Sequence, residues 1–492
     1  MRKPAPASVP ASAAWSRRGF LRSIGLGGAA GAVAAAPAAA GADQSSSPSK
    51  PVVRANGRAK NVLMFVSDGM NIGTLSLTNL FSREFKGTTD PWLRLYQEHP
   101  ELVARGLMDV SSADSPVTDS AAIASCWSSG HRIPNGRINI DADGNRLTPL
   151  YETLGAKGKA TALVTTARVT HATPAGFASA VDNRGKENDI APQYRELGVD
   201  VILGGGRPYF QADRRPDELD LMARYRADGY HVATNRQQML EGKSAERMLG
   251  LFHDDHLPYH IDWLHCGELQ QTVPTLAEMT STAIDLLADR PEGFVMQIEA
   301  ARVDHAGHLN DLGAIIHDQI AFGEALEVGL RFAMERDDTL VIITTDHGCG
   351  GPNLNGAGPG YRDSGTRFSQ INKASRSFEA LAARLARQDG EAGDDAADLV
   401  ASSLGIDLSS GQRRDLLAGI NAIKADGRLS APRLVTPLAD LQSGACAVSW
   451  NSTAHTGDLV EIAALGAGSD ALRPFIENRY IRPWILSATG AA

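Results

Sequence analysis

The stretch of sequence that decides the fold runs from residue 61 to residue 69 and reads NVLMFVSDG. A short apolar run stops abruptly at a polar turn, which is the pattern of a buried strand. The pattern recurs in four later apolar runs that end in polar or glycine-rich turns: residues 160–164, 199–203, 294–298 and 340–343. Helical patterns lie between these runs, as in residues 276–287 and 315–334.

Apolar strands that alternate with helices predict an α/β fold, with a large, mostly parallel central sheet and helices on both faces. In such sheets, ligands bind at the carboxyl ends of the strands. Polar clusters follow several of the predicted strands, at Asp68, Glu299 and Asp346. We therefore expect the functional site at this edge of the sheet.

The region from about residue 366 to residue 440 is richer in charge and alanine. Its helical spacing, across residues 378–385, 397–404 and 412–423, predicts a helical insertion or subdomain. We expect this insertion to interrupt one catalytic domain that spans residues 60–490. No tandem repeat is evident.

The composition excludes several classes of protein. The 492 residues include 48 Lys and Arg against 57 Asp and Glu, a formal charge of −9. With 43% hydrophobic and 21% charged residues, the chain is not wholly disordered, a collagen or a disulfide miniprotein. The acidic balance argues against nucleic-acid-specific binding. Four cysteines are too few for a disulfide framework, although one or two bridges stay open and the sequence does not choose their pairing.

The first 42 residues contain no acid and carry an arginine pair at Arg17 and Arg18. A weakly apolar run over residues 24–36 and small residues over 37–42 follow. This order predicts a twin-arginine-type signal peptide over residues 1–42, cleaved near Ala40 or Ala42, and a linker over 43–59. A membrane anchor is the alternative, but the run is too short and too rich in Ala and Gly. We expect a periplasmic or secreted product with no stable membrane span after cleavage.

Four segments carry residues that can bind a metal. Asp304 and His308 are four positions apart, so they can share one cation if the segment is helical. The other segments contain Asp68, the pair Asp346-His347, and His455. Any one of these alone would be read as a surface or capping residue. Together they indicate a metal centre, in which mixed Asp and His ligands suit zinc and oxygen ligands suit magnesium.

A serine motif, VTDSAA, occupies residues 117–122. One interpretation is a helix N-terminus in which Asp119 or Ser120 is the N-cap. The functional interpretation uses the same geometry, because free N–H groups and the helix dipole stabilise an alkoxide or a phosphoryl oxygen there. No histidine-based triad is evident, so a metal would have to lower the pKa of the serine.

These motifs occur together in one known order. Asp68-Gly-Met, the serine motif, residues 299–308, Asp346-His347-Gly and residues 453–457 follow one another as they do in alkaline phosphatases. The chain resembles a bacterial member of this metal-dependent family from about residue 60 to residue 485. The resemblance implies an exported phosphomonoesterase that works through a phosphoserine intermediate and has an alkaline pH optimum.

The resemblance also implies roles for individual residues and the cofactors two Zn²⁺ and one Mg²⁺ per chain. Ser120 would be the nucleophile, and Arg184, oriented by Asp119, would bind phosphate oxygens. The implied ligands are Asp304, His308 and His455 for one zinc, Asp68, Asp346 and His347 for the second zinc, and Asp68, Thr173 and Glu299 for magnesium.

Two histidines distinguish this chain from other members of the family. His171 and His305 stand where some members have Asp and Lys, and they resemble animal and several marine bacterial members. The resemblance places His171 in the outer shell of the magnesium site and His305 near phosphate, where water can lie between them. Faster phosphate release and a more alkaline optimum would follow. The alternative is that both rings simply pack or form hydrogen bonds.

Three other functions are alternatives to this interpretation. A phosphodiesterase of the same superfamily remains an alternative, because the sequence does not show whether the pocket has room for a second ester substituent. A sulfatase would need an Arg that residues 111–117 lack, and a non-catalytic metal or phosphate binder would be expected to lack a nucleophile or ligand. The expected partners are small phosphate monoesters, and a homodimer is left open. The histidines of residues 253–265 predict a polar surface loop, with a further metal site as the alternative.

Overall fold

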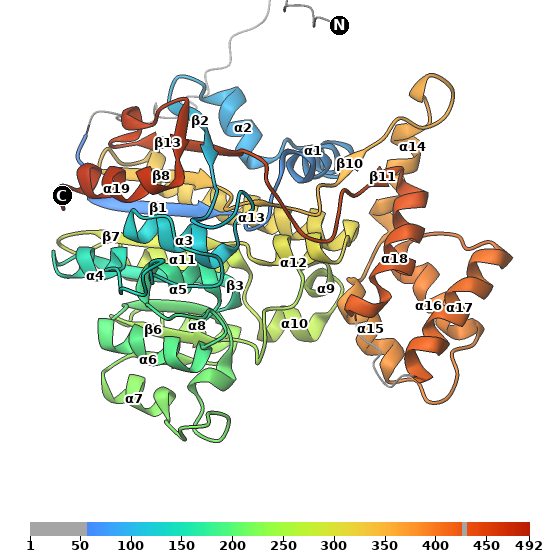
Figure 1. Cartoon of the computed structure of the whole chain (residues 1–492), viewed down its shortest axis with the longest axis horizontal. Helices are drawn as coiled ribbons and strands as arrows, with labels where there is room; N and C mark the ends of the chain where they lie inside the picture. Colours follow the sequence, from blue (N-terminus) through green and yellow to red (C-terminus); the bar gives the residue numbers. More distant parts are fainter. Residues whose placement is uncertain (1–56, 426–430) are drawn as a thin grey trace, which may run out of the picture. The chain divides into compact units, whose positions relative to one another are not determined.

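The computed structural model describes residues 57–425 and 431–492 (Figure 1). The predicted signal peptide and residues 43–56 of the predicted linker lie outside the described residues, so both stay predictions. The last part of that linker is described: the backbone N–H of Ala59 donates to the carbonyl of Ala488 at 2.8 Å. None of the helices in the described parts is long and apolar enough to cross a lipid bilayer.

A ten-stranded sheet forms the centre of the described chain, in the order β14-β2-β13-β8-β1-β7-β3-β4-β6-β5. Strand β1 (Asn61–Val66) lies between β7 (Phe294–Glu299) and β8 (Thr339–Thr344) and is parallel to both. The order continues through β3 (Ala160–Arg168) and β4 (Val201–Gly205). These strands contain most of each predicted apolar run, and the predicted α/β class with a mostly parallel sheet is confirmed.

The edge of the sheet beyond β8 departs from parallel order. Strand β13 (Val460–Gly466) pairs antiparallel with both β8 and β2 (Val103–Asp109). The other strands are β5 (His231–Ala233), β6 (Met248–Leu251), β14 (Phe475–Glu477) and the short strands β9 (Gly348–Cys349), β10 (Asn353–Leu354), β11 (Val448–Ser449) and β12 (His455–Thr456).

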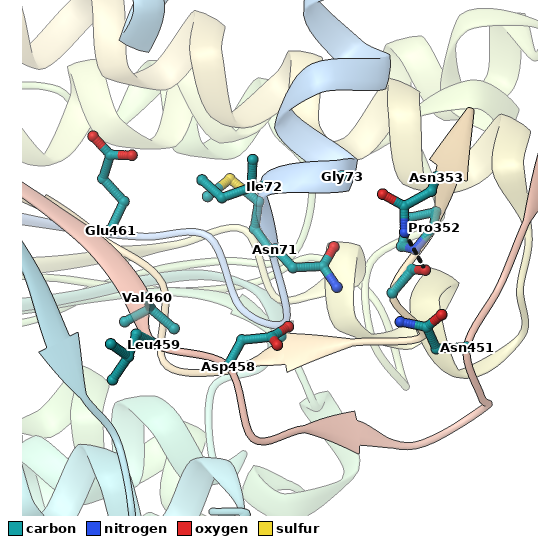
Figure 2. Close-up of a pocket in the computed structure, with 13 residues that line it drawn as sticks. Asn71, Ile72, Gly73, Pro352, Asn353, Asn451, Asp458, Leu459, Val460 and Glu461 are labelled. Carbon is teal, nitrogen blue, oxygen red and sulfur yellow. Dashed lines mark hydrogen bonds between the residues drawn. The ribbon is translucent and has the colours of Figure 1, made fainter. Parts of the chain in front are cut away.

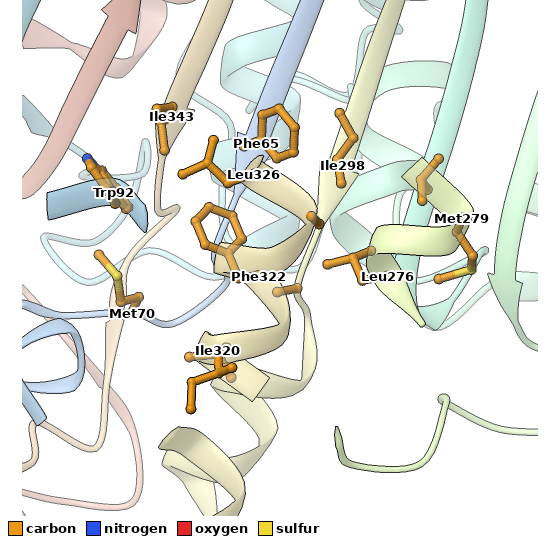
Figure 3. Close-up of a cluster of buried hydrophobic side chains, with 14 of the residues drawn as sticks. Phe65, Met70, Trp92, Leu276, Met279, Ile298, Ile320, Phe322, Leu326 and Ile343 are labelled. Atoms are coloured by element: carbon orange, nitrogen blue, oxygen red, sulfur yellow. The ribbon is translucent and has the colours of Figure 1, made fainter. Parts of the chain in front are cut away.

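Helices cover both faces of the sheet, because alternate residues of each central strand point to opposite sides. On one face, Phe65 of β1 meets Phe322 of α13 (Leu312–Met334), with ring centroids 6.3 Å apart (Figure 3). Helix α11 (Leu276–Leu287) packs beside α13 and begins at a capping box formed by Thr275 and Glu278. On the other face, Val62 and Met64 belong to a core shared with α3 (Ser120–Ser129), α5 (Ala172–Ala178) and α19 (Ile481–Thr489).

The region predicted as an insertion is helical. It lies in sequence between β10 and β11, which pair antiparallel, and holds α14 (Ser364–Phe368), α15 (Phe378–Ala386), α16 (Asp394–Leu404), α17 (Ser410–Ala425) and α18 (Ala431–Cys446). Helices α15–α18 share a core of their own, to which Leu381, Val400 and Leu438 belong. We call α15–α18 the helical insertion below.

The remaining helices connect the strands or lie at their ends. They are α1 (Ile72–Phe81), α2 (Pro91–Glu98), α4 (Leu150–Gly155), α6 (Glu187–Leu197), α7 (Leu221–Ala227), α8 (Arg236–Glu241), α9 (His260–Leu264), α10 (Gly267–Thr272) and α12 (Arg302–His308). Short 3-10 and π helices cover Ser82–Lys86, Arg207–Phe210, Pro359–Tyr361, Ser369–Lys373, Ser469–Ala471 and Asn478–Tyr480.

Candidate active site

The register of the central strands gathers the polar clusters at one edge. Val66 of β1 lies opposite Glu299 of β7 and Thr344 of β8, and Thr165 of β3 lies on the other side of Glu299. The strands are parallel, so the turns that follow them meet at the same end of the sheet. Asp68, Glu299 and Asp346 are therefore brought together although more than 270 residues separate the first from the last.

The first group of candidate ligands contains Asp304, His308 and His455. Helix α12 places Asp304 and His308 one turn apart, with His308 Nε2 3.4 Å from Asp304 Oδ2. His455 arrives from β12, and its Nε2 lies 3.4 Å from Asp304 Oδ1. The thiol of Cys349, which the sequence did not single out as a ligand, joins the same group.

The hydrogen bonds of the two histidines fix which ring nitrogen is free. His308 Nδ1 lies 2.7 Å from the carbonyl of Thr453, and His455 Nδ1 lies 2.8 Å from the carbonyl of Thr118. A carbonyl only accepts, so each Nδ1 carries the proton and each Nε2 of a neutral ring offers a lone pair. The two Nε2 atoms face each other at 3.1 Å. Two lone pairs at this separation repel unless a metal ion or a proton lies between them, and a ring that donates to a carbonyl is typical of metal-bound histidine.

The second group contains Asp68, Asp346 and His347, all fully buried. His347 Nε2 lies 3.1 Å from Asp346 Oδ2 and 3.6 Å from Asp68 Oδ1. The backbone N–H of Gly69 holds the other Asp346 oxygen at 3.0 Å. Both oxygens of Asp68 and Oδ2 of Asp346 have no hydrogen-bond partner.

The third group joins Asp68 to Glu299 and His171. Thr165 Oγ1 donates to Glu299 Oε2 at 2.6 Å, which leaves Glu299 Oε1 without a hydrogen bond. The hydroxyl of Thr173, at the start of α5, is also buried and without a partner. This set is richer in oxygen than the other two, as a site for a hard cation requires.

Electrostatics supports cations at these three places. Burial, and then the neighbouring carboxylates of Asp346, Asp304 and Glu299, raise the pKa of Asp68 well above its ordinary value. Burial likewise raises the pKa of Glu299 to about 7. Buried carboxylate oxygens without donors are costly in a protein interior unless a cation or proton compensates them. The residues present therefore fit bound metal ions, with Asp and His around two positions and oxygen atoms around the third.

The serine motif forms the N-terminus of α3, and Asp119 is its N-cap. Asp119 Oδ1 accepts from the backbone N–H of Ala122 at 2.9 Å. Ser120 is the first helical residue, is 1% exposed, and places Oγ 3.3 Å from His347 Nε2. The structural and functional interpretations of this motif are therefore compatible, because the helix start lies beside the second ligand group.

The second oxygen of Asp119 holds an arginine at the same site. Asp119 Oδ2 accepts from Arg184 Nη1 and from the backbone N–H of Gly136, both at 3.0 Å. Arg184 Nη2 lies 3.1 Å from His171 Nε2. A guanidinium only donates, so His171 Nε2 accepts and its proton lies on Nδ1.

Three histidines lie together beside these groups. The ring centroids of His256 and His305 are 4.3 Å apart, and those of His171 lie 5.4 and 5.5 Å from them. Burial and the Arg302 guanidinium lower the pKa of His305 to about 3, so the ring is neutral. Each ring of this histidine cluster contacts an arginine: Arg184 for His171, Arg168 for His256 and Arg302 for His305.

The prediction of a polar surface loop over residues 253–265 was partly wrong. His256 belongs to the histidine cluster, and His260 is 7% exposed and stacks on Trp263 with ring planes 9° apart. Among the described residues, no candidate metal group includes a histidine of this segment. The sequence also missed Arg168 and Arg302. The only available signal was their position, with Arg168 as the last residue of β3 and Arg302 shortly after the end of β7.

A separate cavity of about 380 Å³ lies beside the loops that carry the ligands (Figure 2). Its lining includes Met70, Gly348 and Asp458, which follow Asp68, His347 and His455 closely in sequence. Asn71, Asn353 and Asn451 contribute amide groups to it. None of the proposed ligands lines this cavity, so it is distinct from the candidate active site.

Comparison with known proteins finds relatives over most of the chain. A family model described as alkaline phosphatase matches residues 59–490. Alkaline phosphatase 3 of Bacillus subtilis is 30% identical over 436 residues, which cover 87% of this chain and 88% of that protein. The crystal structure of Thermus thermophilus alkaline phosphatase is similar with a TM-score of 0.80 and 32% identity, over 89% of this chain and 93% of that one. A cold-active alkaline phosphatase from Shewanella sp. has a TM-score of 0.73 and 28% identity, over 87% and 99%.

The fold and these relatives together define the protein as a hydrolase of phosphate monoesters. Its family follows from the extent of the match, which covers nearly all of the described chain. The chain belongs to the alkaline phosphatase family.

Proposed function

We propose that the protein is an exported, metal-dependent phosphomonoesterase in which Ser120 is transiently phosphorylated. The observation that carries this proposal is the position of Ser120 Oγ, 3.3 Å from His347 Nε2 and at the start of α3. The same serine lies beside an arginine whose orientation is fixed by its neighbour Asp119. The start of α3 thus holds both the nucleophile and the carboxylate that orients the arginine.

The chain's own residues would act in two transfers. In the first, Ser120 Oγ forms a bond to phosphorus while the bond to the ester oxygen breaks and the alcohol leaves. In the second, water takes the phosphoryl group from Ser120 and inorganic phosphate is released. Arg184 presents planar N–H donors to phosphate oxygens, and the free N–H groups at the start of α3 favour negative charge there.

We propose that Asp304, His308 and His455 hold one zinc ion, and that Asp68, Asp346 and His347 hold a second. Asp68, Glu299 and Thr173 would hold magnesium, with His171 in its outer shell. Bound at these positions, the ions supply positive charge that lowers the pKa of the serine and stabilises the entering and leaving oxygens. The lone pairs of the two facing Nε2 atoms and the unpartnered carboxylate oxygens support this ligand set.

His171 and His305 would contribute neutral N–H donors at the edge of the phosphate site. The hydrogen bond from Arg184 leaves the proton of His171 on Nδ1, an atom that is buried and without a partner. A protonated Nδ1 cannot bind a metal directly, but it can donate to water that does. This geometry supports an outer-shell role for His171. His305 lies beside Asp304 and is proposed to contact phosphate through water.

The proposal is tested with protein that begins at residue 43, assayed with and without a chelator. We expect p-nitrophenyl phosphate to be hydrolysed far faster than bis-p-nitrophenyl phosphate or p-nitrophenyl sulfate between about pH 7 and pH 11. The rate should be highest at alkaline pH, because Ser120 deprotonates more readily there. Ser120→Ala should abolish this activity, and no phosphoserine should be trapped in this variant. Ser402→Ala, at an exposed serine of α16, is the matched control.

Other outcomes point to the alternatives. Preference for the diester or the sulfate would leave the metal site intact but overturn the substrate class. If metal-replete protein binds phosphate and hydrolyses none of the three, the protein is a binder and the catalytic role of Ser120 is wrong.

A further inference from the structure

We propose that Arg302 is a positioning residue that fixes the tautomer of His305, and that Glu379 of the helical insertion holds Arg302 in place. The inference rests on the proposed phosphate site and extends it to a part of the chain with no assigned role. It would give the helical insertion a function in substrate binding.

Arg302 and His305 lie on the same face of α12, three positions apart. Arg302 Nη1 is 3.0 Å from His305 Nδ1. A guanidinium has five N–H donors and no acceptor, so His305 Nδ1 must accept this hydrogen bond. The proton of the neutral ring is therefore on Nε2.

This tautomer leaves His305 with a donor directed away from Arg302, because Nε2 lies on the opposite side of the ring from Nδ1. No described residue accepts a hydrogen bond from His305 Nε2. The ring lies next to Asp304 in sequence and 5.5 Å from His171, which contacts the phosphate-binding Arg184. The Nε2–H group is thus available to a phosphate oxygen or to a water that binds one, whereas the other tautomer would offer only a lone pair.

Arg302 keeps its orientation through three contacts. Its side chain is 3% exposed, and Nη2 donates to Glu379 Oε2 at 2.8 Å. The guanidinium carbon lies 3.6 Å from the centroid of the Tyr259 ring, in cation–π geometry. Its backbone N–H donates to Thr166 Oγ1 at 3.2 Å. The ring fixes the plane of the guanidinium, while Glu379 fixes its rotation within that plane.

Glu379 comes from the first turn of α15, whose start is tied to the catalytic domain. Asp311 Oδ2 accepts from the backbone N–H of Phe378 at 2.6 Å, and Asp262 accepts from the N–H and hydroxyl of Ser377. These bonds place the Glu379 side chain within reach of Arg302. The helical insertion is thereby connected to the candidate phosphate site through one carboxylate and one guanidinium.

The histidine tautomer is measured directly by nitrogen NMR of metal-replete protein labelled with ¹⁵N-histidine. His305→Asn identifies the resonances of His305 by their loss. We expect a protonated Nε2 and an unprotonated Nδ1 in the wild type, and a mixture of tautomers in Glu379→Gln. A His305 ring protonated on Nδ1 in the wild type would overturn the proposal. This measurement needs no turnover, so it stays decisive even if the proposed catalytic function fails.

Inhibition by inorganic phosphate measures the consequence. Glu379→Gln and Arg302→Met should each raise the inhibition constant roughly threefold to tenfold, as expected for the net contribution of one ordinary hydrogen bond. Arg302→Lys retains an N–H donor and should recover part of the loss. Arg413→Gln, which removes an ion pair within the helical insertion, is the control and should change nothing.

A double-mutant cycle separates positioning from stability. In a His305→Ala background, Glu379→Gln should have no further effect on phosphate inhibition, although its effect on thermal stability should be unchanged. If Glu379→Gln weakens phosphate binding equally in both backgrounds, the action does not pass through His305 and the proposal is wrong. Unchanged phosphate binding in both Arg302→Met and Glu379→Gln would overturn it as well.

Discussion

Replacing Asp119 separates the two tasks that the structure gives this residue. One carboxylate oxygen caps α3 through the N–H of Ala122, and the other holds Arg184 at 3.0 Å. In Asp119→Asn, the amide oxygen can keep the cap, but the NH₂ group would face the N–H groups of Arg184 and Gly136. The variant should therefore lose the orientation of Arg184 and keep most of the cap.

The magnitudes follow from the contacts. Loss of an N-cap costs about 1 kcal/mol of stability. The side chains of Arg184 and Asp119 are 28% and 20% exposed, so the pair contributes about 1 kcal/mol, which corresponds to roughly a fivefold change in binding. Asp119→Asn should raise the KM for p-nitrophenyl phosphate and the inhibition constant of phosphate by roughly fivefold. Asp119→Ala should add the loss of the cap.

The assay pairs urea unfolding with phosphate inhibition and includes a matched control. Asp220 caps α7 in the same way, by accepting from the N–H of Ala223 at 2.8 Å. Asp220→Ala should lower the free energy of unfolding by about 1 kcal/mol with no change in phosphate binding. If Asp119→Asn binds phosphate as the wild type does, or if Asp220→Ala weakens binding as much, Asp119 does not position Arg184.

Three further predictions concern binding, pH and the metal loops. Arg184→Lys should raise KM roughly tenfold with a smaller change in kcat, because the ammonium group of lysine cannot present the planar pair of N–H donors of a guanidinium. Unchanged values of KM and kcat would contradict this prediction. Burial raises the pKa of Asp318 to about 8, so its ionisation opposes folding as the pH rises from about 4 to 8. Asp318→Asn should flatten the loss of stability measured by urea unfolding between about pH 5 and pH 8. Gly69 has φ +73°, and an added Cβ would lie 2.6 Å from Asp304 Cα, so Gly69→Ala should lower the content of bound metal and reduce activity on the order of a hundredfold. Gly87→Ala, at φ +68° with open space around it, should leave both unchanged.

The sequence was most informative where burial is complete on both sides of a strand. The residues of β1, β7 and β8 are all buried, so their apolar runs could be recognised in the sequence as strands. Strand β2 was not recognised, because it lies near the sheet edge, is mostly half-buried and contains Arg105 and Gly106. Its pairing with β13 depends on residues more than 350 positions away, and no local pattern reports such a contact.

The same distinction applies to the candidate site. Asp304 and His308 share a short helix, so their proximity could be predicted from spacing alone. The residues themselves also pointed to Asp68, Asp346, His347 and His455, and the structure brings these side chains together with Asp304 and His308. Only Thr173 and His171 depended on the resemblance to a family. His256, Arg168 and Glu379 carry no such motif. Their contacts with the site depend on how the end of β3 and the segments after β6 and β10 pack, which is a property of the tertiary structure.

The arginines of the site share one arrangement that bears on how it can bind phosphate. Asp119 holds Arg184, Glu187 holds Arg168, and Glu379 holds Arg302. Each pair neutralises most of the charge of its guanidinium and in return fixes the direction of its N–H donors. These arginines therefore provide geometry more than net attraction. Since the site is also lined by buried carboxylates, the net attraction for a phosphate dianion must come from the cations that those carboxylates and histidines are arranged to hold.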